Sequence, residues 1–382
     1  MTWPMAGERI KSLRQLLGIS QDELADAAGV SQALISHIEQ GVRDASEDLI
    51  VAVASATATP RKFFEVTPVD IPLGSLRFRK NATASRRDTK RVKALFDEAF
   101  RLVQDLIAQT GYPAPNLPIM TGHVSSDDIE NIAVQTREAL QLGGDGPIRH
   151  LTRACERAGL AVTPLVLPGD HDADDEAIGH FGVSHWPGPH DPGLIGLFSG
   201  GSGDRQRFTV AHELAHLVLH NPRRREIQDP EGEANRLAGA ILLPYDRAHE
   251  VLAGNVTLSD LAAVKAKWGI SMQALIMRGN HLGLIDDQRK LSLFKQLSAR
   301  GWRKNEPVVV HNEEPKLVWR LLVSQYGDPL PYSHVANATG LNPVVLRSLA
   351  PPPSAPNLPP QHRNGTKEPA RRGATVSRLR LA

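Results

Sequence analysis

Two histidines four residues apart, with a glutamate directly after the first, form the pattern His212-Glu213-x-x-His216. Four residues make about one helical turn, so both imidazoles lie on the same side of a helix and can bind one ion. Glu213 lies one position round the helix, where it can act on water at the ion without replacing it, which suits a general base. The flanking residues are apolar, which predicts a buried helix whose polar groups need a metal or hydrogen-bond partners. The pattern therefore predicts a zinc site.

A zinc site of this kind needs a third protein ligand, and an acidic residue on a neighbouring helix is the usual source. Glu231 and Asn235 are four residues apart, so Glu231 can bind the ion while Asn235 orients a histidine through a hydrogen bond. Glu233 is the alternative ligand, although it points to another side of its helix. His220 lies at the frayed end of the first helix, and we expect it at the surface or as a cap. His and Glu donors also accept other divalent ions, so the choice of zinc rests on ligand type.

The residues around this motif resemble the ImmA/IrrE metallo-endopeptidase family, whose pattern is close to FTxAHExxH, then ExxAN/DxFA, then LLMP. Phe208 begins the first part in this chain, and the later parts depart at Leu237 and Leu243, where the family has Phe and Met. Both departures exchange one apolar side chain for another and leave the chemistry untouched. The likeness covers about residues 145–305.

This resemblance implies a zinc-dependent endopeptidase that hydrolyses a peptide bond, with His212, His216 and Glu231 holding zinc. The ion would polarise the scissile carbonyl, and Glu213 would take a proton from water and pass it to the leaving amine. The group that helps to stabilise the oxyanion stays open among four candidates: His180, His185, Arg236 and Tyr245.

A second pattern lies near the start of the chain. Ser20 with Glu23 three residues later forms a capping box, Gly29 supplies a left-handed helix stop, and Ser31 caps a further helix that Gly41 ends. The apolar positions between them are spaced as the core of two packed helices: Leu24, Ala25, Val30 and Ile35. Residues 8–65 resemble the Cro/C1-type, or Xre-family, helix-turn-helix.

In such a module the helix that follows Ser31 enters the major groove of double-stranded DNA, with its N-terminal residues toward base edges. The resemblance makes Gln32 and Ser36 the candidates for reading bases and places Ala33 and His37 beside them. Gln21 and Arg43 would contact the phosphates. The full set of candidate DNA-binding residues is Gln21, Ser31, Gln32, Ala33, Ser36, His37 and Arg43.

Charge is unevenly distributed along a chain whose net charge is only +2. Residues 1–65 carry six Lys or Arg against nine Asp or Glu, so the module should bind DNA weakly on its own, because phosphate contacts supply most non-specific affinity. Residues 77–93 carry eight basic residues and one acidic residue. This run either adds positive charge beside the DNA or forms a solvated helix face. Dimerisation on a two-fold operator would also strengthen DNA binding.

The elements expected around these motifs define a mainly α fold with a small sheet, in the α+β class. Helical periodicity and capping residues predict an all-α N-terminal module, a helix over about 88–109 and further helices after residue 205. A strand over 160–167 and a hairpin formed by 180–186 and 193–198 predict a short antiparallel sheet before the motif helix. The expected domain is therefore zincin-like, with C-terminal helices after it.

Composition shifts divide the chain into five expected segments. Pro, Gly and charge dominate the first connector, and the chain becomes Pro-rich and then basic from residue 351, too poor in apolar residues to repay ordering. The segments are a helix-turn-helix domain at 6–66, a linker with connecting helices at 67–144, the peptidase-like domain at 145–305, a helical extension at 306–350 and a disordered tail at 351–382. A weak helix-turn pattern at 330–349 is more typical of helices that pack on the core than of a second DNA-binding motif.

A length of 382 residues, with 41% hydrophobic and 23% charged residues, is ordinary for a globular protein of two or three domains. The longest apolar runs fall far short of a membrane span, and charges at Glu8 and Arg9 interrupt any secretory signal. The single cysteine, Cys155, suits a small buried hydrophobe and a reducing compartment. We therefore expect a cytoplasmic protein without a membrane partner.

Together the motifs predict a DNA-binding transcriptional regulator that carries a zinc endopeptidase. Family analogy gives an Xre-type repressor or an antitoxin-like protein as substrate, with self-cleavage around residues 66–87 as a further expectation. The other expected partners are a DNA operator and a second copy of the chain. Two alternatives stay open: a non-proteolytic, ligand-sensing transcription factor resembling the short-chain fatty acyl-CoA regulators, and a DNA-binding antitoxin.

Overall fold

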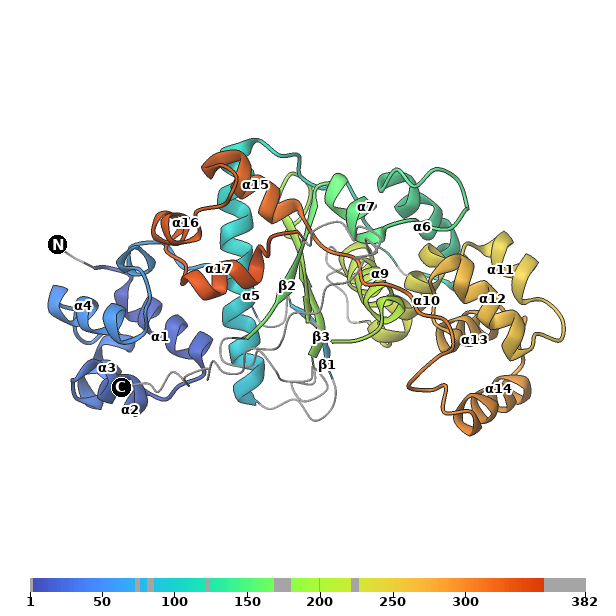
Figure 1. Ribbon diagram of the computed structural model, residues 1–382, viewed down its shortest axis with the longest axis horizontal. Helices are drawn as coiled ribbons and strands as arrows, with labels where there is room; N and C mark the ends of the chain where they lie inside the picture. Colours follow the sequence, from blue (N-terminus) through green and yellow to red (C-terminus); the bar gives the residue numbers. More distant parts are fainter. Residues whose placement is uncertain are drawn as a thin grey trace, which may run out of the picture.

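A computed structural model describes residues 3–72, 76–80, 86–120, 122, 124–167, 180–198, 200–220 and 227–353. Along the long axis lie a helical N-terminal group at one end, a sheet between helices in the middle and a second helical group at the other end (Figure 1). The tail expected to be disordered lies outside the described residues from 354 onward. No helix among the described residues is both long and apolar enough to cross a membrane.

The N-terminal group consists of α1 (Ala6–Leu17), α2 (Gln21–Ala28), α3 (Gln32–Glu39), α4 (Glu47–Ala56) and the 3-10 turn η1 (Arg61–Phe64). The expected capping box is present, because Ser20 and Glu23 exchange side-chain and backbone hydrogen bonds. Gly29 ends α2 at φ 66°, a left-handed conformation that favours glycine. Ile10, Leu24 and Ile35 are buried in the core of this group. The helical N-terminal domain is confirmed.

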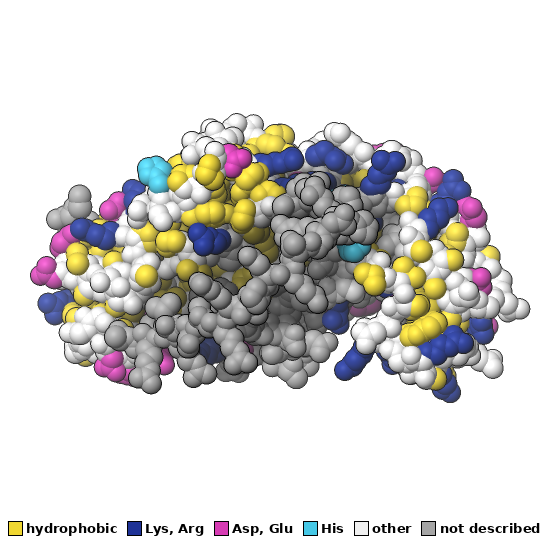
Figure 2. All heavy atoms as spheres, in the orientation of Figure 1, with side chains coloured by type: hydrophobic (Ala, Val, Ile, Leu, Met, Phe, Trp, Pro, Cys, Tyr) yellow, Lys and Arg dark blue, Asp and Glu magenta, His cyan; other side chains and the backbone are white. Residues whose placement is uncertain are grey.

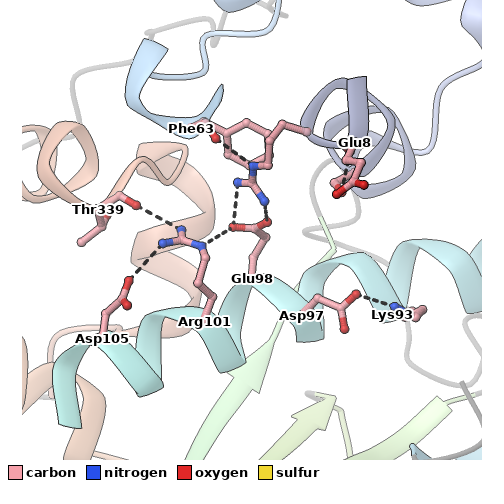
Figure 3. A network of polar contacts seen from close by, with 10 residues as sticks. Glu8, Phe63, Lys93, Asp97, Glu98, Arg101, Asp105 and Thr339 are labelled. Atoms are coloured by element: carbon pink, nitrogen blue, oxygen red, sulfur yellow. Dashed lines mark hydrogen bonds and ion pairs between the residues drawn. The ribbon is translucent and has the colours of Figure 1, made fainter. Parts of the chain in front are cut away.

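Helix α5 (Arg86–Thr110) lies between the N-terminal group and the sheet (Figure 1). One side of it carries a buried ion-pair network: Glu98 binds Arg9 of α1 and Arg101, with Nη1–Oε1 of the first pair at 2.5 Å and Nε–Oε2 of the second at 3.1 Å (Figure 3). The opposite side packs on the sheet through Phe96 and Phe100, which are buried in a second hydrophobic core. The segment between the two predicted domains therefore forms a packed layer.

The sheet has the strand order β1-β3-β4-β2, with β1 (Arg77–Lys80), β2 (Leu160–Leu165), β3 (His180–His185) and β4 (Gly193–Phe198). β3 and β4 form the expected antiparallel hairpin, but β2 pairs parallel with β4. The prediction of an antiparallel sheet was therefore wrong in part, and the sheet is mixed. Every residue of β4 is buried, as expected for a central strand covered on both faces.

The other face of the sheet is covered by α9 (Gly203–Leu219), on which α10 (Pro230–Leu242) packs. The strand residues alternate accordingly: Leu194 and Phe198 face the core with α5, whereas Ile195 and Leu197 face the core with α9. The elements around α9 and α10 are α6 (Ser126–Ala139), α7 (Leu151–Arg157), α11 (Tyr245–Leu252), α12 (Leu258–Trp268), α13 (Met272–His281) and α14 (Asp287–Ala299). The middle of the molecule is thus a helix–sheet–helix sandwich.

The C-terminal helices α15 (Leu317–Tyr326), α16 (Tyr332–Thr339) and α17 (Pro343–Leu349) return to α5 and the sheet edge at β2 (Figure 1). Val335 and Leu346 are fully buried there, so this segment packs the core, as expected from its sequence. Cys155 is also fully buried, and burial raises the pKa of its thiol, which suits a structural residue.

Candidate metal centre

Helix α9 brings the two motif histidines to one side, as the four-residue spacing predicts. The helix packs against β3 and β4, and His212 and His216 are at most 1% exposed. Their Nε2 atoms face each other at 3.0 Å. Apolar residues along the rest of α9, including Val210, Leu214 and Val218, are buried in the core and hold the helix in place.

Helix α10 supplies the carboxylate. Asp229 caps this helix by accepting from the Gly232 N–H, and Pro230 occupies its first turn, so the helix begins directly before Glu231. Glu231 Oε2 lies 3.3 Å from His212 Nε2, and its Oε1 lies 3.4 Å from His216 Nε2. The three side chains form a group able to hold a metal ion.

The donor set fits a zinc ion by distance and by chemistry. Ligands at about 2.0–2.1 Å in tetrahedral geometry lie about 3.3–3.4 Å apart, and the three distances here are 3.0, 3.3 and 3.4 Å. Hydrogen bonds from His212 and His216 lower the pKa of Glu231, which keeps its carboxylate ionised and ready to bind a cation. The Glu231 side chain is 56% exposed, so an ion and water can reach the group from that side.

Each motif histidine also has a partner at Nδ1, the ring nitrogen that faces away from the donor group. Asn235 Oδ1 lies 3.0 Å from His212 Nδ1, the contact expected from the sequence. His216 Nδ1 lies 2.7 Å from His220 Nδ1, and His220 Nε2 lies 3.2 Å from Glu233 Oε2. His220 is the C-cap residue of α9, as one of the two expected roles has it. It is only 1% exposed, so the other expectation, a surface histidine, was wrong: α10 covers the last turn of α9. Glu233, the alternative ligand, binds His220.

Glu213 lies on the side of α9 that faces the sheet. Its side chain is fully buried, and its Oε2 accepts a hydrogen bond of 2.7 Å from Ser184 Oγ on β3. A Cβ at Gly182, two residues earlier on the same face of β3, would lie 2.7 Å from Glu213 Oε1. Sequence reasoning missed both residues. Their only signal was a Gly-x-Ser alternation within the predicted hairpin, which gives no pairing with α9.

The four candidates for the oxyanion contact lie in different places. His185 packs its ring against Phe100 of α5, with ring centroids 5.0 Å apart, and is therefore on the opposite face of the sheet from Glu213. Tyr245 stacks on His249 within α11. The side chain of His180 lies outside the described residues. Arg236 follows Asn235 on α10 and contacts Asp229 at 3.8 Å, so it is the candidate nearest to the donor group along the chain.

A groove of about 1320 Å³ is lined by Asn235 and Arg236 of α10, by α13 and by residues 303–306 and 308–312. It borders the centre through Asn235, which contacts Nδ1 of His212. Basic side chains outnumber acidic ones along it. Burial, together with the charges of Arg236, Arg278 and Lys290, lowers the pKa of His281, another lining residue. Some of the basic groups are paired: Lys265 binds Asp204 and Glu306, and Arg278 binds Glu130.

The candidate DNA-binding residues gather on one face of α2 and α3. Ala33 and His37 are exposed, as is Arg43 in the loop that follows. Gln32 Nε2 donates to Gln21 Oε1, and Gln21 Nε2 donates to Glu39, each at 2.8 Å. Two serines also make hydrogen bonds within α3: Ser31 caps the helix, and Ser36 accepts a hydrogen bond from the Gln40 side chain. The structure brings all seven residues to this module.

The basic run at 77–93 divides between two roles. Arg87 donates to the Gly18 carbonyl oxygen at the end of α1, and Lys93 binds Asp70 and Asp97 at 2.6 Å each. A cation at a helix C-terminus is favoured by the helix dipole. Arg87 therefore joins α5 to the N-terminal domain, and Lys93 joins α5 to the connector at Asp70. Lys90 is exposed to solvent.

Comparison with known protein families gives one match for the N-terminal domain and one for the region that contains the donor group. Residues 10–64 match the family model for a helix-turn-helix, and residues 170–280 match the model for an IrrE N-terminal-like domain. The second match lies inside the range expected from the motif and contains the donor group. The chain therefore combines an Xre-type helix-turn-helix DNA-binding domain with a domain of the ImmA/IrrE metallopeptidase type. No curated protein matches the chain.

Proposed function

We propose that this protein is a DNA-binding transcriptional regulator whose second domain is a zinc-dependent endopeptidase, with a repressor, an antitoxin-like protein or the chain itself as substrate. The observation that carries the proposal is the group of two imidazole nitrogens and one carboxylate at 3.0–3.4 Å. Glu213 follows His212 directly on α9. Cytoplasmic action on a double-stranded DNA operator is part of the proposal, and the helix-turn-helix domain supports it.

The proposed mechanism assigns His212, His216 and Glu231 to the ion and Glu213 to proton transfer. Zinc, when bound, supplies polarisation of the scissile carbonyl and acidification of water. Glu213 takes the proton from the attacking water and delivers it to the leaving amine nitrogen. Ser184 holds the Glu213 carboxylate by one oxygen, and the buried position of the carboxylate keeps bulk water from competing for its proton.

Glu213→Gln tests this mechanism, because glutamine keeps the shape of the side chain and cannot accept the proton. We expect zinc to stay bound and the cleavage rate to fall by about 10²–10⁴-fold. The measurement is metal analysis of the purified chain, with mass spectrometry of Xre-type repressors incubated with it. Glu250→Gln, a change at an exposed carboxylate on α11, is the control. Undiminished cleavage by Glu213→Gln would refute the mechanism.

The groove that Asn235 borders supports the ligand-sensing alternative, since neither the donor residues nor Glu213 line it. Its volume of about 1320 Å³ would admit a small molecule, and its basic side chains outnumber its acidic ones. Sensing predicts that a small anionic molecule changes operator binding equally in the wild type and in Glu213→Gln. Peptidase function predicts that only the wild type loses repression when substrate is cleaved.

Binding as a homodimer is a further part of the proposal. Hydrophobic side chains gather over α15–α17 on the face shown in Figure 2, close to the N-terminal domain. Val344 is 53% exposed and Val51 of α4 is 44% exposed. Because the N-terminal domain is acidic, we expect it to bind DNA weakly alone, and two copies on a two-fold operator would double the contacts. Sedimentation velocity with and without operator DNA checks this.

A further inference from the structure

Two buried histidines and a partly buried glutamate form a chain of contacts that leads away from the candidate metal centre. His216 belongs to the donor group, and its Nδ1 lies 2.7 Å from Nδ1 of His220, one helical turn further along α9. His220 Nε2 lies 3.2 Å from Glu233 Oε2 on α10. The His216 and His220 side chains have no exposed area, and the Glu233 side chain is 15% exposed.

With a cation held at the donor group, the chemistry of these groups fixes the direction of the hydrogen bonds; without one, Nε2 of His216 can instead donate to Glu231, 3.4 Å away. An ionised carboxylate only accepts, so His220 must donate to Glu233 from Nε2. A neutral imidazole has one N–H, so Nδ1 of His220 is then an acceptor. His216 must donate to it from its own Nδ1. That assignment leaves the lone pair of His216 on Nε2, the atom that faces His212 and Glu231.

The opposite assignment would disable the centre. If His220 carried its proton on Nδ1, His216 would have to accept there and would carry its own proton on Nε2. A protonated Nε2 cannot bind a cation. His212 avoids this problem through a separate partner, because the amide oxygen of Asn235 accepts from its Nδ1. The two metal-facing imidazoles thus have different hydrogen-bond partners: the Asn235 amide for His212, and the His220–Glu233 pair for His216.

We propose that His220 and Glu233 are positioning residues that hold His216 in the Nδ1–H tautomer and aim its Nε2 lone pair at the metal. This inference rests on the proposed function in taking the donor group as a metal site. It adds two residues that neither contact the ion nor enter the motif. Partners of this kind, located behind a metal ligand, change metal affinity by about 10–100-fold when removed.

The tautomer of His220 is measurable in the zinc-loaded protein. Long-range ¹H–¹⁵N correlation spectra of the full chain, labelled with ¹⁵N in the histidine rings, distinguish the two tautomers. His220→Leu identifies the signals. We expect the Nε2–H form of His220 in the wild type, with Nδ1 accepting from His216. The Nδ1–H form would overturn the inference, whether or not the protein cleaves a substrate.

Zinc affinity of two variants completes the test. His220→Leu keeps an apolar volume but removes the acceptor, and we expect zinc to bind about 10–100-fold more weakly in competition with a chromophoric chelator. His220→Asn places an amide oxygen near the position of Nδ1 and should restore most of the affinity, which a merely structural role would not predict. His249→Leu on α11 is the matched control. Equal zinc affinity of His220→Leu and the wild type would overturn the inference.

These outcomes separate the inference from the function on which it rests. If the wild type has the expected tautomer and His220→Leu loses zinc affinity, the pair positions His216 even when no repressor is cleaved. If cleavage is present but the tautomer is the other one, the peptidase proposal stands and the pair does not have this role.

Discussion

The Glu213 carboxylate occupies a space that exists because residue 182 has no side chain. A Cβ at Gly182 would lie 2.7 Å from Glu213 Oε1 and 2.9 Å from Thr209 Cγ2. Gly182→Ala therefore displaces the carboxylate, whereas neither motif histidine is among the three atoms nearest to that Cβ. We expect zinc to be retained and the cleavage rate to fall by about a hundredfold, the effect of a small misplacement.

Gly143→Ala is the control for this prediction, because a Cβ there meets no atom within 4 Å. The assay is cleavage rate against bound zinc for both variants. Full activity in Gly182→Ala would show that the general base tolerates displacement, and the close approach of β3 would then have no catalytic consequence.

At the scale of elements, Glu313 joins two helices that the sequence does not connect. Its carboxylate accepts from the backbone N–H groups of Leu151 and Thr152 at the start of α7, at 3.0 and 2.6 Å. It also binds Arg207 of α9 at 2.5 Å. Although burial alone would raise its pKa, the contacts with His150, Arg207 and Thr152 lower the pKa of Glu313 to about 2.

Glu313→Gln removes this charge from a site that is 6% exposed and leaves Arg207 buried without its counter-ion. We expect the free energy of unfolding to fall by about 3–5 kcal/mol at neutral pH, the usual cost of breaking a buried pair. Glu314→Gln, at the exposed neighbouring residue, should leave it nearly unchanged. Urea unfolding of the three proteins measures the difference.

The same carboxylate predicts a pH dependence. Because its pKa is lowered on folding, from 4.5 to about 2, it stabilises the fold fully above pH 4.5 and loses this contribution as the pH falls toward 2. The wild type should therefore lose stability across that window more steeply than Glu313→Gln. Equal slopes would show that the group titrates alike in the folded and unfolded chains.

The elements differ in how far the sequence predicts them. Local signals were sufficient for α2, α3 and α9, because caps, a left-handed glycine and apolar spacing act within one turn. The parallel pairing of β2 with β4 and the burial of His220 depend on segments that meet only in the folded chain. Ser184, Gly182 and Glu313 belong to this second kind: each acts on a helix from a distant part of the sequence.

At the scale of the whole molecule, one buried ion-pair network holds the DNA-binding domain on the central layer. Glu98 of α5 binds Arg9 and Arg101, Arg9 donates to the Phe63 carbonyl oxygen, and Arg101 donates to the Thr339 carbonyl oxygen (Figure 3). Although burial alone would raise it, the two arginines lower the pKa of Glu98. The network thus joins the N-terminal domain, α5 and the C-terminal helices, and α5 packs on the sheet that supports Glu213.

Glu98→Ala leaves two arginines in a buried site without their shared carboxylate. We expect a loss of about 3–5 kcal/mol from the contact between the domains, so that α1 and η1 separate from α5 before the rest of the chain unfolds. Hydrogen exchange should then rise at amides of α1, η1 and the facing side of α5, while α9 and α10 stay protected. Glu8→Ala, an exposed change on α1, serves as the control. If exchange rises equally in all helices, the network stabilises the molecule as one unit, and the DNA-binding domain is not held by a separable contact.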